Sequence, residues 1–165
     1  ADYWLWLGRA CGDRARRASV LRARGLAGCA RGAFERAVAL DDELLDARSH
    51  LVDFHLEAPG IAGGRREAAV RQADAIYRRD APRGLLERAR VADALGREDE
   101  AERLRAEYLQ GPPTTDPKMR SVEAWLRGRE AERRGDHEAA HRAFLQALEL
   151  DPRNAAARES LRTLR

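Results

Sequence analysis

The sequence predicts an all-α fold in which antiparallel helix hairpins stack side by side. Its composition suits closely packed helices, because Ala, Leu, Arg and Glu dominate while aromatic residues make up only 5% of the chain. One pattern also recurs along the chain: a glycine, an acidic residue, a small residue and an aromatic or apolar residue, followed by alanine and a Leu/Asp ending. Segments rich in Gly and Pro separate the helical stretches. We therefore expect almost no β-strand.

The clearest copy of this pattern lies near the C-terminal end. A first helix carries Trp125, Leu126, Gly128 and Ala131 and turns at Gly135. The second helix then carries the rest of the pattern, Asp136, His137, Glu138, Ala139, Ala140, Phe144, Ala147, Leu148, Leu150, Asp151 and Pro152. These residues match the second helix of the tetratricopeptide repeat (TPR) nearly position for position, so the chain resembles the TPR family. The resemblance implies a right-handed superhelical stack, a TPR-like α-solenoid of about four repeat units.

The remaining units follow the same logic. We expect a single TPR-like domain over 1–165, with units at about 1–42, 43–80, 81–110 and 118–152 and a polar capping helix at 153–165. One alanine in each second helix marks the point where that helix should cross its neighbour, at Ala30, Ala69, Ala101 and Ala140.

Three segments depart from a regular repeat. About ten extra residues, 14–24, lie inside the first unit, and their Ala/Leu/Arg content predicts extended helix rather than a loop. The glycine-containing segment 58–64 is interpreted as an elongated turn, since it lacks the Lys-Ser/Thr ending of a phosphate-binding loop. Segment 111–117 contains three prolines and predicts a non-helical linker.

Charge and cysteine content exclude several classes of protein. The 31 basic and 28 acidic residues are interspersed and leave a net charge of only +3, which argues against nucleic acid as a partner. No apolar run approaches the roughly 20 residues of a membrane span. Cys11 and Cys29 lack the CxxC spacing of a metal or redox site, so we expect two small core residues, with one disulfide in an oxidising compartment as the alternative.

The resemblance implies that the first helices of the hairpins line a concave face that binds a partner. In the register above, the face collects Leu5, Arg9, Ser49, Asp53, Leu56, Leu86, Arg90, Trp125, Arg129 and Arg133. Arg9, Arg90 and Arg129 take equivalent places in their repeats, so their guanidinium groups would point into one groove and hold a carboxylate or an acidic peptide.

The alternative is a solvated charged face whose arginines are neutralised by Asp53, Asp93 and Glu132. TPR domains that grip a C-terminal carboxylate carry Lys and Asn at the first inward positions. Here those places hold Leu5 and Arg9, so that clamp is not expected.

No arrangement of residues predicts catalysis, a cofactor or a metal. His137 and His141 share a helix face, but no third ligand of suitable spacing accompanies them. We therefore expect a non-catalytic module that binds a protein or peptide partner. The alternative is a carrier of an apolar small molecule such as a lipid, favoured by the long first unit and the apolar start 3–7, which is also a candidate surface for a homo-oligomer.

A location is implied by resemblance. Segment 58–64 is similar to a loop in envelope-associated bacterial TPR proteins with cleaved signal peptides, which implies a periplasmic chain. A cytoplasmic location is the other possibility. The sequence starts at Ala1 with neither methionine nor a leader, and we expect that an upstream segment has been removed.

Overall fold

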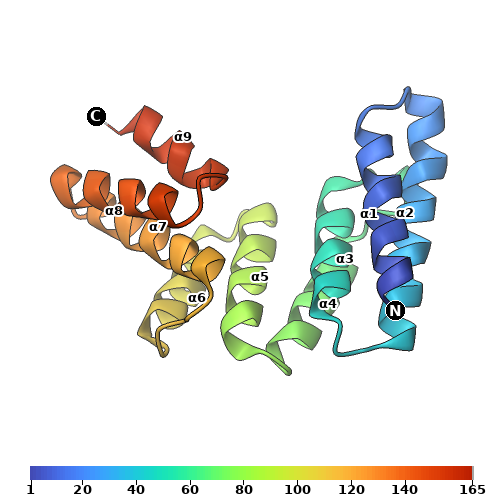
Figure 1. Ribbon diagram of the computed structural model, residues 1–165, viewed down its shortest axis with the longest axis horizontal. Helices are drawn as coiled ribbons and strands as arrows, with labels where there is room; N and C mark the ends of the chain where they lie inside the picture. Colours follow the sequence, from blue (N-terminus) through green and yellow to red (C-terminus); the bar gives the residue numbers. More distant parts are fainter. Residues whose placement is uncertain (165) are drawn as a thin grey trace. The chain divides into compact units, whose positions relative to one another are not determined.

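The computed structural model describes residues 1–164, with the side chain of Val20 left aside. All regular structure in this range is helical, which confirms the all-α prediction (Figure 1). The elements are α1 (Asp2–Arg16), α2 (Val20–Leu40), α3 (Leu45–Glu57), the 3₁₀ helix η1 (Gly60–Ala62), α4 (Arg66–Tyr77), α5 (Ala81–Ala94), α6 (Glu98–Gln110), α7 (Pro117–Arg133), α8 (His137–Leu150) and α9 (Ala155–Thr163).

The chain divides into two compact units, residues 1–105 and 106–165, and α6 begins in the first and ends in the second. The single continuous domain therefore stays a prediction. In the first unit each helix from α1 to α5 packs on the next, and α3 also packs on α5. This packing is that of stacked helix hairpins, as in a TPR-like helical repeat.

In the second unit, α7 and α8 form one hairpin and α9 packs on both helices. Its core is built from Ala131, Ala140 and Phe144. Helix α9 seals the neighbouring cluster through Ala157, which is fully buried with Ala124 and Ala147. Helix α9, Ala155–Thr163, occupies most of the segment 153–165.

The four alanines expected at helix crossings lie in the core. Ala30, Ala69, Ala101 and Ala140 are all buried, with exposed fractions between 0 and 3%. Because alanine adds little bulk, the helix axes can approach closely at these points.

The predicted departures from the repeat take definite forms. Helices α1 and α2 extend through most of segment 14–24 and leave only a short turn at 17–19, which confirms extended helix. Segment 111–116 is non-helical, and α7 begins at Pro117 with its N-terminus capped by the Asp116 carboxylate. The hairpin turns after α5 and α7 use Gly96 (φ 72°) and Gly135 (φ 77°), in the left-handed region that glycine adopts at helix ends.

The expectation of two separate core cysteines is wrong. Cys11 on α1 and Cys29 on α2 are joined by a disulfide. The two helices of the first hairpin pack so that the cysteine Cα atoms lie 6.0 Å apart, within the range that a disulfide can bridge. The first hairpin is therefore closed covalently as well as by packing.

Candidate functional site

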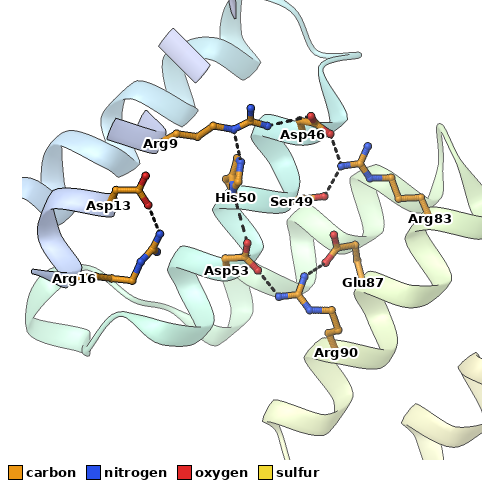
Figure 2. Close-up of polar contacts among 10 residues, drawn as sticks. All are labelled: Arg9, Asp13, Arg16, Asp46, Ser49, His50, Asp53, Arg83, Glu87 and Arg90. Carbon is orange, nitrogen blue, oxygen red and sulfur yellow. Dashed lines mark hydrogen bonds and ion pairs between the residues drawn. The ribbon is translucent and has the colours of Figure 1, made fainter. Parts of the chain in front are cut away.

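A polar network runs across α1, α3 and α5 in the first unit (Figure 2). Each of these is the first helix of its hairpin. Helix α3 stands between α1 and α5 and supplies Asp46, Ser49, His50 and Asp53. These four side chains share one face of α3 because their spacing of three, four and seven residues follows the helical repeat. We call the whole set the polar ladder; its members are Arg9, Asp46, Ser49, His50, Asp53, Arg83, Glu87 and Arg90.

The ladder joins α1 to α3 through His50. Arg9 Nε donates a hydrogen bond to His50 Nε2 at 2.9 Å, and the His50 ring stacks on Phe34 with ring centroids 4.9 Å apart. His50 Nδ1 lies 3.7 Å from Asp53 Oδ2. Because Nε2 accepts from Arg9, the imidazole proton belongs on Nδ1, facing Asp53.

Asp46 lies between two arginines from different helices. Its carboxylate is 3.2 Å from Arg9 Nη2 on α1 and 2.7 Å from Arg83 Nη2 on α5, and Arg83 also donates to Ser49 Oγ at 2.9 Å. The hydrogen bond from Arg83, together with the charges of Arg83 and Arg9, holds the pKa of Asp46 below its ordinary value despite partial burial.

Arg90 on α5 completes the ladder. It forms an ion pair with Asp53 and another with Glu87 at 2.8 Å. Burial acts to raise the pKa of Asp53, but the hydrogen bond from His50 and the charge and hydrogen bond of Arg90 outweigh burial and lower that pKa. Glu87 is itself buried, with 7% of its surface exposed, so Arg90 neutralises a carboxylate that water hardly reaches.

Four of the ten predicted site residues, Arg9, Ser49, Asp53 and Arg90, come together in the ladder. Leu5 lies instead in the hydrophobic core with an exposed fraction of 5%, and Leu56 is half-buried against the neighbouring core cluster. Leu86, on α5, is half-buried as well.

The other three predicted site residues belong to α7 in the second unit. Trp125 Nε1 donates to Ser160 Oγ at 3.1 Å, so the indole is part of the contact with α9. Arg129 lies 3.6 Å from Glu132, and Arg133 is exposed near the C-terminal end of α7. The ten residues as one binding surface therefore stay a prediction.

The alternative prediction is a solvated face whose arginines are neutralised by Asp53, Asp93 and Glu132. Two of these acids do pair with arginines of the predicted site. Arg90 binds Asp53, and Arg129 binds Glu132. Asp93 is bound to Arg105 instead.

Sequence reasoning missed half of the ladder: Asp46, His50, Arg83 and Glu87. A signal for them was present, because each lies three or seven residues before Asp53 or Arg90 and hence on the same helix face. Acids at 41–46 precede or begin α3, where they could cap its N-terminus, yet α3 has no side-chain cap. Asp42 and Glu43 bind Arg79 instead, and Asp46 joins the ladder.

A cavity of about 850 Å³ lies beside the ladder and shares Arg9, His50 and Asp53 with it. Its other walls come from α1, α2, the end of α3 and the segment that contains η1. Seven alanines and two glycines belong to the lining, together with the rings of Phe34 and Phe54, and most of the lining surface is apolar. None of the helices described here is long and apolar enough to cross a bilayer.

The stacked hairpins and the ladder across successive first helices define a helical-repeat protein. The tetratricopeptide repeat family model matches residues 123–154, which comprise most of α7, all of α8 and the turn that follows. This chain therefore carries a tetratricopeptide repeat, at the position predicted from the sequence. No curated protein matches the chain, and the similarity to envelope-associated proteins stays a prediction.

Proposed function

We propose that this chain is a non-catalytic interaction module that binds a segment of a partner polypeptide along the polar ladder. Tetratricopeptide repeats serve as protein-interaction modules, which supports a protein partner. The observation that carries the proposal is the ladder itself. Three first helices, α1, α3 and α5, present one continuous row of hydrogen-bond donors and acceptors that is still partly exposed.

The pairing within the ladder sets the chemistry of the partner. Each guanidinium group of the ladder already binds a carboxylate, so the row carries both charges and does not form a purely basic groove. A partner segment with mixed polar groups can exchange hydrogen bonds with such a row at little electrostatic cost. Trp6 adds an apolar contact at one end of the ladder, since it is 65% exposed. The Arg9 guanidinium carbon lies 5.1 Å from the centroid of the Trp6 ring.

Two further parts of this proposal concern the surroundings of the chain. The disulfide between Cys11 and Cys29 supports an oxidising compartment, such as a bacterial periplasm, because disulfides persist there. Alkylation of unreduced cell extract followed by mass spectrometry tests this, and free thiols on both cysteines would count against it.

Exposed Tyr3 and Trp6 support a homo-oligomer through the N-terminal end, which light scattering of a Trp6→Ala variant tests.

The second candidate function is a carrier of an apolar small molecule. The cavity beside the ladder favours it, because most of the surface that lines the cavity is apolar.

The polypeptide proposal is tested by selecting binders from a phage-displayed library of random dodecapeptides. We expect the selected peptides to bind at least tenfold more weakly to an Arg83→Ala/Arg90→Ala variant, neither of whose sites lines the cavity. The matched control, Arg22→Ala/Arg36→Ala, removes two exposed arginines of α2 and should bind as wild type does. Circular dichroism establishes that each variant is folded. Equal binding by both variants would remove the ladder from the site.

A further inference from the structure

The two main departures from the regular repeat meet at the same cavity. The first is the lengthened hairpin, whose extra residues include Ala15, Ala18, Leu21 and Ala23 in the lining. The second is the segment after α3, which reaches the opposite side of the cavity through residues 58–62. Neither departure is needed to form a helix hairpin, since α7 and α8 pack without them. Their shared product is the cavity.

The cavity has the dimensions and lining of a small-molecule site. Its volume of about 850 Å³ falls within the range of roughly 300–1,000 Å³ for ligand pockets. Phe34 and Phe54 provide aromatic surface, and two lining side chains, Leu21 and Ile61, are 91% and 80% exposed. Leaving large apolar side chains in water is unfavourable, so a ligand that covers them would gain from the hydrophobic effect.

The charged groups of the lining balance one another. Three arginines and three acids contribute to it, namely Arg9, Arg16, Arg24, Asp13, Asp53 and Glu57. Four of these six residues are held in ion pairs. Arg16 and Asp13 pair with each other, Arg9 pairs with Asp46, and Asp53 pairs with Arg90. A ligand with net charge would bring that charge to an apolar cavity whose rim has no excess of the opposite sign, which is costly.

We infer that this cavity binds an uncharged, largely apolar small molecule, with its apolar body between the alanine walls and its polar groups, if any, at the edge formed by Arg9, His50 and Asp53. Residues of α1, α2 and α3 and of the segment 58–62 line the site, whose volume suits a compact molecule. The inference specifies the ligand of the second candidate function and rests on it. It does not depend on a polypeptide at the ladder.

The test compares two dyes that differ only by a sulfonate: 1-anilinonaphthalene, which is uncharged, and its anionic relative 8-anilinonaphthalene-1-sulfonate. Fluorescence titration of the full chain should show saturable binding of one uncharged dye per chain, at least tenfold tighter than binding of the sulfonate. The Ala27→Trp substitution fills the cavity from α2 and should weaken the uncharged dye at least tenfold. Ala39→Trp makes the same change at an exposed site of α2 that does not line the cavity, and should leave binding unchanged.

Three results would overturn the inference. No saturable binding of the uncharged dye would mean that the cavity takes no such molecule. Equal affinity in wild type and in Ala27→Trp would place the dye elsewhere, for example on Trp6. Tighter binding of the sulfonate would contradict the uncharged class. Because Arg83 and Arg90 do not line the cavity, loss of peptide binding in their variant with normal dye binding separates the two proposals.

Discussion

Gly128 on α7 lies directly against the aromatic ring of Phe144 on α8, so close that a β-carbon on the glycine would overlap the ring. Gly8 on α1 and Phe34 on α2 make the same contact in the first hairpin, although about ten more residues separate them along the chain. The first hairpin has therefore been lengthened beyond its crossing point while the crossing itself is preserved.

Alanine at either of these glycines should destabilise the fold. We expect Gly8→Ala and Gly128→Ala each to lower the free energy of unfolding by about 1–3 kcal/mol, because the added methyl overpacks a filled contact with phenylalanine. Denaturant unfolding followed by circular dichroism measures the change. Gly25→Ala and Gly28→Ala on α2 are matched controls with open space at the β-carbon; they should raise stability by about 0.5–1 kcal/mol through helix propensity. A neutral Gly128→Ala would contradict the packing.

Replacing a buried alanine of a second helix with a larger residue should also destabilise the fold. Ala140 has no exposed surface and packs with Ala131 and Phe144, so Ala140→Leu should cost about 1–3 kcal/mol of unfolding free energy. The same substitution at Ala156, on the exposed side of α9, should leave the melting temperature nearly unchanged. If Ala140→Leu melts as wild type does, the repeat register is wrong.

The disulfide should contribute measurably to stability. Cys11 and Cys29 are 18 residues apart in the sequence, and closing a loop of this length in the unfolded chain is worth about 3 kcal/mol in the chain-entropy model. We expect a Cys11→Ser/Cys29→Ser variant to lose stability of this order in thermal and denaturant unfolding. A reducing agent should lower the melting temperature of wild type and leave that of the variant unchanged. If reduction has no effect on wild type, the disulfide is not formed in solution.

Acidification should weaken the fold through His55. This side chain is buried, with 8% of its surface exposed, and burial lowers its pKa below the ordinary value. The unfolded chain therefore binds a proton more readily than the folded chain, so this contribution to stability is complete above about pH 6.5 and is lost as the pH falls towards the folded-state pKa.

We expect the free energy of unfolding to decline from pH 7.5 to 5.5 in wild type and to decline less in His55→Gln. The exposed histidine at 137 provides the control substitution, His137→Gln. A profile that is the same in all three proteins would show that His55 does not contribute. Asp46 and Asp53, whose pKa values are lowered, act at more acidic pH: their contribution is complete above about pH 4 and is lost below it, so the two effects occupy different ranges.

Local pattern was sufficient to predict most of the fold. Helix hairpins follow from small and apolar residues at helical spacing, and the buried alanines at 30, 69, 101 and 140 are visible in the sequence because each recurs at one place in its repeat. The site was only half visible. Arg9 and Asp53 were placed by register, but Asp46 bridges Arg9 and Arg83, residues of different helices that only packing brings together. For the same reason, the disulfide and the meeting of two irregular segments at one cavity were beyond prediction from spacing.

The disulfide between α1 and α2 also changes what a cut in the first hairpin would do. The turn at 17–19 is a natural place for a protease that recognises arginine, since Arg16 and Arg17 are exposed there. Cleavage would open the backbone but release nothing, because Cys11 and Cys29 lie on opposite sides of the cut. The nicked protein would run as a single species on a non-reducing gel and separate into two fragments only after reduction. In an environment rich in proteases, the first hairpin would thus survive damage to its most accessible turn.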